Sequence, residues 1–171
     1  MRLIVGDIRL TVGDVQYVDA LGALFMTTRN TLSSNQYLAA IPASLAVAAD
    51  YLASKPEARC DMPFGEGAWV FKVADKMFAL LYQRQGEDCL NLKCDPQQAL
   101  ELRDVFESVT AGYHMNKRHW NTIYLGGDVP AGEVERMIDH SYALVYRGLT
   151  KAKQREFAIR YTDQQLLGEA G

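Results

Sequence analysis

Apolar residues recur at helical spacing in the middle of the chain. Leu45, Ala49 and Leu52 lie four and three positions apart and predict a helix that ends before Lys55-Pro56. A second helix is predicted after Asp95, a good N-cap, with Pro96 in the first helical position and Gln98 at the capping-box position. The expected buried face of this second helix is Leu102, Val105, Phe106 and Val109.

The C-terminal third shows the same helical spacing over a longer run. A long helix is expected to start near Pro130 and to end at Gly148. Thr150 can cap a last, basic helix with the sequence KAKQREFAIR. The expected buried face of the long helix is Val134, Met137, Ile138, Ser141, Leu144 and Val145.

Strand-like runs occupy the region between these helices. WVFKV (69–73), MFALLYQR (77–84) and CLNLKC (89–94) are joined by short polar turns, which indicates an antiparallel meander. NTIYL (121–125) predicts one more strand, ended by Gly126-Gly127. Antiparallel strands mixed with helices predict an α+β fold: a two-layer sandwich, with helices packed on one face of an antiparallel sheet.

The first 42 residues differ from the rest. Short β-like runs alternate with a repeated Val-Gly-Asp turn signal, and residues 26–36 are polar, as a linker would be. We therefore expect an N-terminal extension over residues 1–42 and one domain over residues 43–171. Asp7, Asp14 and Asp19 interrupt every apolar stretch near the N-terminus, which argues against a signal peptide, and no run is long enough to span a bilayer. The expected location is cytoplasmic.

The net charge and the cysteine content limit the classes of function that fit this chain. The 171 residues carry 18 Lys and Arg against 21 Asp and Glu, a net charge of −3, so any grip on nucleic acid has to come from a local patch. Cys60, Cys89 and Cys94 form neither a disulfide framework nor a metal knuckle, and reduced structural thiols are expected. Cys89 and Cys94 flank a strand five residues apart, so their side chains should lie on opposite faces.

Residues 113–127, YHMNKRHWNTIYLGG, concentrate the polar chemistry of the chain. His114 and His119 are five positions apart, which fits neither a helical metal pair nor an HExxH motif. His140 has Asp139 beside it, but adjacent helical positions do not face one another. An enzyme would need a concave site that collects these histidines with a carboxylate. We expect no metal, no cofactor and no catalytic residue.

The same stretch suits nucleic acid better. Lys117 and Arg118 can pair with phosphates, Asn116 can contact a base edge or a phosphate, and Tyr113 or Trp120 can stack on an unpaired base. The alternative is structural: Trp120 anchors the loop in the core and the charges are solvated. The last helix adds a second basic cluster of Lys151, Lys153, Arg155 and Arg160. The turn residue Lys76 and the strand residues Lys72, Arg84 and Lys93 could contribute if they share a face.

Five segments together resemble the MmcQ/YjbR-like family of small bacterial proteins. They are KPEARCDMPFG, FKVADKMFALL, LNLKCDP, YHMNKRHWNTIYLGG and DHSYALVYRGLTKAKQR, and they span roughly residues 45 to 160. The resemblance implies an α+β sandwich similar to frataxin-like and secretion-chaperone-like domains. It also implies DNA binding through a "double wing" of hairpins, one of which would pass through Ala74, Asp75 and Lys76.

The resulting hypothesis is a non-enzymatic, weakly sequence-selective DNA-binding protein. Tyr113 and Trp120 would anchor the loop. The expected DNA contacts are Asn116, Lys117, Arg118, His119, Lys76, Lys151, Lys153 and Arg155. The alternative is a protein-interaction or small-ligand module that uses the sheet face, with Tyr82, Trp69 or Phe71 exposed as anchors. Expected partners are therefore DNA or another protein, and no membrane.

Overall fold

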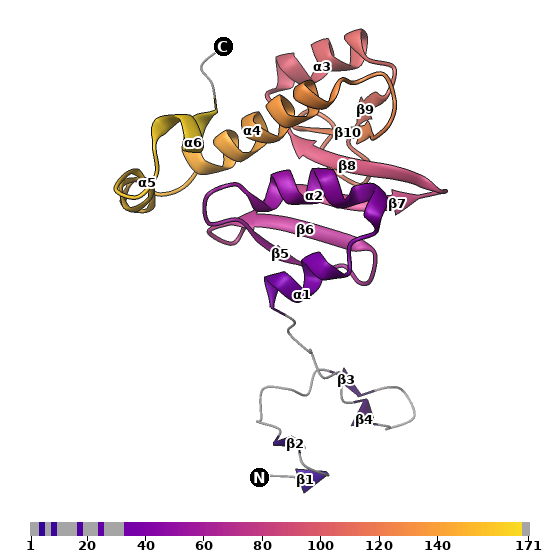
Figure 1. Ribbon diagram of the computed structural model, residues 1–171, viewed down its shortest axis with the longest axis vertical. Coiled ribbons are helices and arrows are strands. Elements are labelled where there is room, and N and C mark those ends of the chain that lie inside the picture. The colour runs from indigo at the N-terminus through magenta and orange to yellow at the C-terminus, as the bar shows by residue number, and fades with distance from the viewer. Residues whose placement is uncertain (1–3, 6–7, 10–16, 19–23, 26–32, 169–171) are drawn as a thin grey trace. The chain divides into compact units, whose positions relative to one another are not determined.

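The computed structural model describes residues 4–5, 8–9, 17–18, 24–25 and 33–168, and the chain divides into two units, Met1–Leu32 and Ser33–Gly171 (Figure 1). In the first unit, β1 (Ile4–Val5) pairs with β2 (Ile8–Arg9), and β3 (Tyr17–Val18) pairs with β4 (Leu24–Phe25), both antiparallel. The β-like runs predicted here are thus partly observed. The second Val-Gly-Asp, residues 12–14, lies outside the described residues.

The second unit begins with a helix that overlaps the segment predicted as a linker, residues 26–36. Helix α1 (Ser34–Ala39) follows Ser33, whose backbone N–H donates to Gln36 Oε1 at 2.8 Å. The Ser34 hydroxyl accepts from the Cys60 backbone N–H at 3.3 Å, so α1 is bonded to the folded unit. The polar residues at 33–36 therefore cap and begin a helix instead of forming a linker.

A short 3₁₀ turn, η1 (Ala43–Leu45), leads into α2 (Ala46–Ala53). Leu45, Ala49 and Leu52 are all buried, which confirms the predicted helical face. Pro56 follows at once and is itself buried.

Six strands then form one antiparallel sheet in the order β5-β6-β7-β8-β10-β9 (Figure 1). The predicted meander is confirmed as β6 (Ala68–Val73), β7 (Lys76–Arg84) and β8 (Glu87–Lys93), and the predicted later strand is β10 (Trp120–Tyr124). The two edge strands, β5 (Arg59–Asp61) and β9 (Val109–Ala111), were not predicted. Each has only three residues.

The remaining helices are α3 (Pro96–Val105), α4 (Ala131–Arg147), α5 (Lys151–Ala158) and α6 (Asp163–Leu167). Asp95 caps α3, as predicted, by accepting from the Gln97 N–H at 2.9 Å, and Thr150 caps α5 by accepting from the Lys153 N–H at 3.3 Å. Gly148 is the C-cap of α4, also as predicted. None of the described helices combines the length and hydropathy needed to cross a bilayer.

Strand alternation gives the sheet two different faces. Trp69, Phe71, Leu81, Leu90 and Ile123 belong to the hydrophobic core, together with buried residues of α2, α3 and α4. This arrangement confirms the predicted α+β sandwich of helices packed against an antiparallel sheet. The opposite side of the same strands is called the outer face below; it carries Val70, Lys72, Leu80, Tyr82, Arg84, Cys89, Asn91, Lys93, Trp120, Thr122 and Tyr124.

The predicted buried face of α3 is confirmed only in part: Leu102 and Val109 are buried, but Val109 lies in a strand and not in the helix. Val105 is 67% exposed, Phe106 has extended backbone with ψ 123°, and Val109 already lies in β9. The helix ends four residues before Val109, which pairs with Ile123 of β10 at the sheet edge. Gln98 forms no capping box; its Oε1 instead accepts from Cys94 Sγ at 3.7 Å.

The buried face of α4 is largely as predicted. Met137, Ile138, Ser141 and Val145 are buried, whereas Val134 and Leu144 are half-buried. The Ser141 hydroxyl donates to the Phe78 carbonyl at 2.5 Å and accepts from the Lys93 N–H at 2.8 Å. A serine in the core face is therefore explained by two backbone groups of the sheet that it satisfies.

Candidate functional site

The loop of residues 112–119, which joins β9 to β10, is held at its base by Arg103 of α3. The Arg103 guanidinium donates to Asn121 Oδ1 at 2.7 Å, to the Trp120 carbonyl at 3.2 Å, and to the Lys117 carbonyl. A planar fork with five N–H donors can meet several acceptors at once, which an ammonium cannot do with the same geometry. One side chain thus ties the loop to both the strand and the helix.

Local turns shape the tip of this loop. The Arg118 N–H donates to Asn116 Oδ1 at 3.0 Å, and the His119 N–H donates to the Asn116 carbonyl at 3.0 Å. Such a side-chain turn is a usual role for asparagine. The His119 carbonyl then accepts from the Cys94 N–H at 2.8 Å. Asn116 is thereby engaged in shaping the loop, while Lys117 and Arg118 remain exposed at its tip.

The two expected anchors of the loop differ in burial. Trp120 is 9% exposed, while Tyr113 is 40% exposed. A Cβ at Gly112 would lie 2.7 Å from the Trp120 Cβ, so the indole residue and the loop backbone pack too closely for a larger residue at that position. Trp120 is the buried member of the pair, and Tyr113 presents its ring at the surface.

Several lysines gather at one end of the sheet with this loop. Trp120 pairs with Lys93 at the point where β10 starts and β8 ends, and Lys76 pairs with Val73 at the β6–β7 hairpin on that same end. The Lys76 ammonium donates to the Gly148 carbonyl at 3.0 Å, which brings the start of α5 to this end as well. Lys76 is exposed and Lys93 is half-buried; with the exposed Lys117 and Arg118 they form what is called the basic end of the sheet below.

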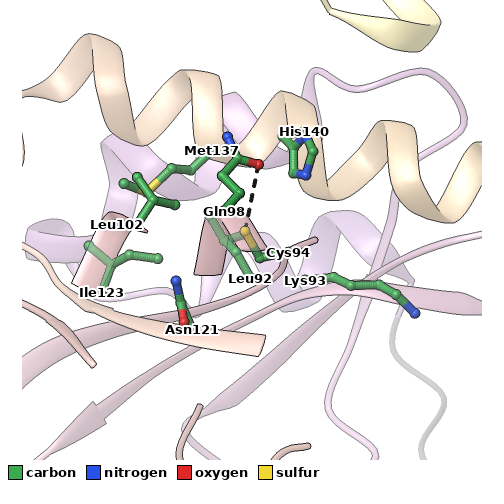
Figure 2. A pocket seen from close by; sticks show the side chains of 9 residues that line it. All are labelled: Leu92, Lys93, Cys94, Gln98, Leu102, Asn121, Ile123, Met137 and His140. Atoms are coloured by element: carbon green, nitrogen blue, oxygen red, sulfur yellow. Dashed lines mark hydrogen bonds between the residues drawn. The ribbon is translucent and has the colours of Figure 1, made fainter. Parts of the chain in front are cut away.

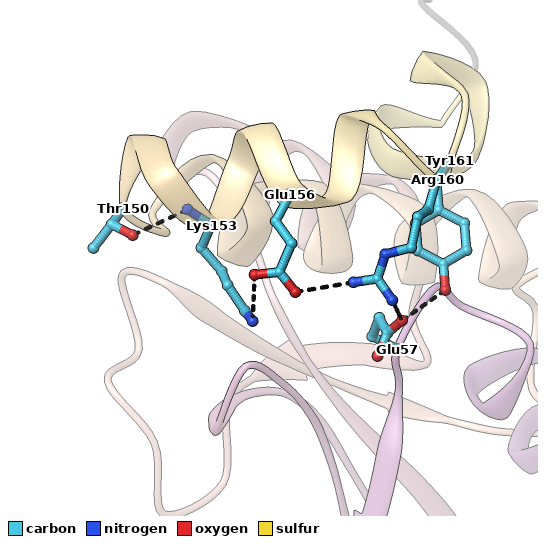
Figure 3. A network of polar contacts seen from close by, with 6 residues as sticks. All are labelled: Glu57, Thr150, Lys153, Glu156, Arg160 and Tyr161. Atoms are coloured by element: carbon cyan, nitrogen blue, oxygen red, sulfur yellow. Dashed lines mark hydrogen bonds and ion pairs between the residues drawn. The ribbon is translucent and has the colours of Figure 1, made fainter.

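Helix α5 is less basic in effect than its sequence indicates. Lys153 pairs with Glu156 at 2.8 Å, and Arg160 bridges Glu156 at 3.1 Å and Glu57 at 2.6 Å (Figure 3). The Tyr161 hydroxyl also donates to Glu57, at 2.8 Å. This network neutralises two of the cations and joins the end of α5 to the segment that follows α2.

The other two expected DNA contacts on α5, Lys151 and Arg155, form no ion pair among the described residues. Arg155 donates from Nε to the Lys151 carbonyl at 3.2 Å, and the Lys151 ammonium reaches Gln154 Oε1 at 3.4 Å. Both residues are exposed. Of the α5 residues, Lys151 is the one placed next to the basic end, because it follows the Gly148 turn that Lys76 contacts.

The three basic strand residues share one face of the sheet, because Lys72, Arg84 and Lys93 all lie on the outer face. Lys72 is paired there with Asp61 at 2.8 Å, and Lys93 Nζ lies 6.0 Å from the centre of the Trp120 ring. Arg84 lies over the ring of Tyr113, with 4.1 Å between its guanidinium carbon and the ring centre.

The anchors expected for a protein-interaction module are corrected by the structure. Trp69 is 5% exposed and Phe71 is fully buried, both on the core face, so neither can serve as a surface anchor. Alternation in β6 places them there, because one face of the strand packs under the helices. Tyr82 is half-buried on the outer face, and its hydroxyl donates to Asn91 Oδ1 at 3.1 Å.

A small cavity lies between α3, α4 and the sheet (Figure 2). Its volume of about 10 Å³ suits a single water molecule and excludes an organic ligand. His140 Nε2 is buried at this cavity without a hydrogen-bond partner, and burial lowers the pKa of His140, with Arg136 and Arg147 adding to the effect. The cavity is lined by Leu92, Lys93, Cys94, Gln98, Leu102, Asn121, Ile123, Met137 and His140.

The cysteines are buried and unpaired by disulfides. Burial raises the pKa of Cys60 to about 12 and that of Cys94 to about 11, and it also raises the pKa of Cys89. Cys94 belongs to the core while Cys89 lies on the outer face, which confirms the predicted opposite orientation. In the described part of the chain, no group of three or more His, Cys, Asp or Glu side chains is placed to hold a metal ion.

A shallow hollow of about 530 Å³ lies beside the loop tip, between it and the start of α3. It gives Lys117 and Arg118 a concave neighbour in which Leu100, 55% exposed, supplies an apolar wall. The hollow is lined by Asp95, Pro96, Gln97, Leu100, Arg103, Lys117 and Arg118.

Sequence reasoning missed Arg103 as the residue that holds the loop, and it missed the pairing of Arg84 with Tyr113. Arg103 sits in the last turn of a predicted helix, where a basic residue is ordinary, and nothing local indicates that it reaches residues 117–121. The one available signal for Arg84 was that it lies two positions after Tyr82 in a strand, which places both side chains on one face.

Comparison with known proteins gives this arrangement a family. The model of the YjbR family matches residues 53–144, which span β5 to β10 and most of α4. The chain is 39% identical over 93 residues to the uncharacterized protein YbdF of Escherichia coli O157:H7, covering 54% of this chain and 76% of that protein. It is 30% identical over 105 residues to the uncharacterized protein YjbR of Escherichia coli K12, covering 61% and 89%.

The chain belongs to the YjbR family. A crystal structure of a Deinococcus radiodurans protein with the DUF419 domain superposes with a TM-score of 0.60 at 36% identity, over 64% of this chain and 83% of that one. A Pseudomonas syringae protein gives a TM-score of 0.50 at 27% identity, over 66% and 98%. The matched part of the YjbR fold therefore includes the loop of residues 112–119 and the β6–β7 hairpin.

Proposed function

We propose that the protein binds DNA, without chemical catalysis, through the basic end of its sheet. The observation that carries the proposal is the exposed pair Lys117 and Arg118 on a loop whose backbone is held by Arg103 and by the buried Trp120. A cation presented on a fixed backbone loses little conformational entropy when it meets a phosphate, because the loop is already ordered.

A second group of cations supports the same footprint. Lys76, beside the predicted wing at Ala74 and Asp75, lies on the sheet end that also carries the loop, and Lys151 follows the turn that Lys76 contacts. Strands β7 and β10 are separated by β8 alone, so the strand ends that lead into the hairpin and the loop are about 10 Å apart across the sheet. Phosphates along one DNA backbone could reach both.

The net charge of −3 sets the expected strength of binding. A few phosphate contacts position a protein without reading bases, so affinity should be modest, strongly dependent on salt and little dependent on sequence. Lys153 and Arg160 are paired with glutamates, so the proposal gives them no phosphate contact.

The test is fluorescence anisotropy of labelled DNA at about 50 and 200 mM salt. Wild type is compared with the double variant Lys117→Ala/Arg118→Ala. Each phosphate contact contributes about 0.7 to 0.9 to the slope of log affinity against log salt, so removing two should lower that slope by roughly 1.5.

A matched control removes the same charge elsewhere. Arg136→Ala/Lys153→Ala also deletes two cations, both paired with glutamates on helix surfaces. Wild-type affinity and salt slope are expected in this control. Absence of binding by wild type at the lower salt, or equal losses in both double variants, would contradict DNA binding at this loop.

A further inference from the structure

Beyond the basic end, the loop places aromatic rings on the outer face of the sheet. The Tyr113 N–H donates to Thr122 Oγ1 at 2.9 Å, and the Asn91 side-chain amide donates to the Tyr113 carbonyl at 3.1 Å. Both backbone polar groups of Tyr113 are thus bonded to side chains of the sheet. The first residues of the loop therefore lie down on the outer face instead of extending from the sheet edge.

The groups beneath Tyr113 form a buried polar network that fixes this position. Thr122 donates to Asn91 Oδ1 at 2.7 Å, and the Tyr82 hydroxyl donates to the same oxygen at 3.1 Å. Asn91 and Thr122 are 0% and 1% exposed, so their polar atoms need these bonds. Buried networks of this kind hold one geometry, and here that geometry sets where the Tyr113 ring stands.

Three planar groups meet above the network. The Arg84 guanidinium lies 4.1 Å from the centre of the Tyr113 ring, and its Nη1 reaches the Tyr124 hydroxyl at 3.4 Å. The centres of the Tyr113 and His114 rings are 4.0 Å apart, with the planes tilted by 54°. Tyr113 is 40% exposed and His114 is also exposed, while Arg84 covers one face of the Tyr113 ring. A surface tyrosine and histidine are therefore held in a defined arrangement without being buried.

The backbone at His114 has an uncommon conformation, which it shares with Glu57, Ala74, Asp75 and Gln85 among the described residues. Its φ is +55°, in the left-handed region that non-glycine residues rarely adopt. Such conformations carry strain and cluster at ligand-contacting sites, where the surrounding structure maintains them. The imidazole of this residue lies against the Tyr113 ring.

We infer that Tyr113 and His114 receive unpaired bases of single-stranded DNA, an inference that rests on the DNA binding proposed above. Every base has a π face, so exposed aromatic rings bind bases without sequence preference, whereas a duplex keeps those faces stacked inside. Only Met115 and Asn116 separate His114 from the cations Lys117 and Arg118. Phosphates of the same strand can therefore pair with the loop tip while a neighbouring base stacks on the rings.

Charge on the outer face is complementary to such a strand. Arg84 and Lys93 lie on this face with the rings, and each contacts an aromatic residue, Tyr113 and Trp120 respectively. In Figure 2 the Lys93 side chain points away from the other residues that line the cavity, and its alternation in β8 directs it to the outer face. Glu87, opposite Arg84 at the hairpin, is the acidic residue nearest to this stack in the strand register.

The test compares three labelled probes of equal length: an oligo-dT strand of about 15 nucleotides, a strand with the same backbone but abasic sugars, and a duplex. All are measured by anisotropy at about 50 mM salt with wild-type protein. Oligo-dT should bind about ten-fold more tightly than the abasic strand, because the base contacts are additional to the phosphates. Equal affinity for these two strands, or tighter binding of the duplex, would overturn the inference.

Variants then locate the contact. The double variant Tyr113→Leu/His114→Asn removes both aromatic rings. It keeps an apolar side chain at position 113 and places at position 114 a residue that tolerates positive φ. It should lower oligo-dT affinity to the abasic level and leave the abasic strand unaffected. Lys117→Ala/Arg118→Ala should instead weaken both strands.

These outcomes separate the two proposals. If wild type binds all three probes equally, DNA binding stands and base stacking fails. If it binds none, DNA binding fails and the stacking inference fails with it. Oligo-dT affinity that persists in the ring variant also overturns the inference, and a circular dichroism melt matching wild type establishes that this variant is folded.

Discussion

Arg103 shows how one side chain determines the form of the loop that carries the proposed site. The loop of residues 112–119 has backbone carbonyls that need partners wherever water is excluded. Arg103 supplies donors to the carbonyls of Lys117 and Trp120 and to the amide oxygen of Asn121. Asn121 is 2% exposed and in turn donates to the Ala99 carbonyl at 3.2 Å. Loop, strand and helix α3 are thus connected through two polar side chains.

We therefore expect Arg103→Lys to destabilise the protein although the charge is kept. An ammonium cannot reach all three acceptors in one plane, so at least one buried acceptor loses its partner, which should lower the free energy of unfolding by about 1.5 to 3 kcal/mol. Urea denaturation measures this loss. Hydrogen exchange should also speed up at residues 117–121. Arg118→Lys, an exchange at the exposed loop tip, is the control and should leave both measurements at wild-type values.

At the scale of elements, the packing of α2 against α4 includes a polar tie. Asp139 of α4 pairs with Lys55, which follows α2, and accepts from the Tyr51 hydroxyl at 3.1 and 3.0 Å to its two oxygens. Lys55 also lies 4.5 Å from the centre of the Tyr51 ring. The side chains of Lys55 and Asp139 are only 13% and 23% exposed, so each charge depends on the other for compensation.

We expect Asp139→Asn to lower the free energy of unfolding by about 2 to 3 kcal/mol, because it leaves the Lys55 ammonium poorly solvated and without a counter-charge. Lys55→Met should also destabilise. The double variant should be less destabilised than the sum, with a coupling energy of about 1 to 2 kcal/mol in urea denaturation. For comparison, Glu133→Gln breaks the exposed pair with Arg136, where less than about 1 kcal/mol is expected. If the losses of unfolding free energy in Lys55→Met and Asp139→Asn add exactly in the double variant, the two side chains are not energetically coupled.

An element of the fold could be predicted from the sequence where its pattern of apolar residues is contained within its own segment. The helix with Leu45, Ala49 and Leu52, the meander and α4 were predictable because their periodicity is contained within each segment. β5 and β9 have three residues each, too few for alternation to be read, and they exist because β6 and β10 offer edges to pair with. Val109, which the apolar spacing placed on α3, pairs there with Ile123 of β10.

The candidate site was predictable in part for the same reason. Lys117 and Arg118 are adjacent in sequence, so their common exposure at a turn could be proposed from the residues alone. The position of Tyr113 could not, because its partners Asn91 and Thr122 lie 22 and 9 residues away. The pair of Lys153 and Glu156 was not predicted, although it has a helical i, i+3 spacing, and the bridge from Arg160 to Glu57 crosses 103 residues.

At the scale of the whole molecule, the chain is acidic overall but carries a local group of basic residues. The net charge of −3 coexists with a sheet end where Lys76, Lys93, Lys117 and Arg118 gather. Under the proposed DNA binding, the acidic excess among the remaining residues would disfavour approach by other surfaces and so favour the basic end. The expected result is weak binding with a preferred orientation, in which removal of two cations at this end matters more than removal of two elsewhere.

The stability of the whole molecule should also depend on pH through His140. This residue sits where α4 meets α3 and the sheet, and burial, followed by the charges of Arg136 and Arg147, lowers its pKa, while Asp95 acts in the opposite direction. The folded protein therefore holds the imidazole neutral at pH values where the unfolded chain, with a pKa of about 6.5, already binds a proton. The stability contribution is complete above about pH 6.5 and is lost as pH falls from there through the folded pKa.

Urea denaturation at about pH 7.5, 6.5 and 5.5 measures this effect. Wild type should lose stability across the interval, whereas His140→Gln should show a flatter profile because glutamine does not titrate. The comparison is made between slopes, since the substitution itself changes packing beside the cavity. His114→Asn, at an exposed histidine of the loop, serves as the matched control and should keep the wild-type slope. A profile of His140→Gln parallel to wild type would show that another group governs acid sensitivity in this range.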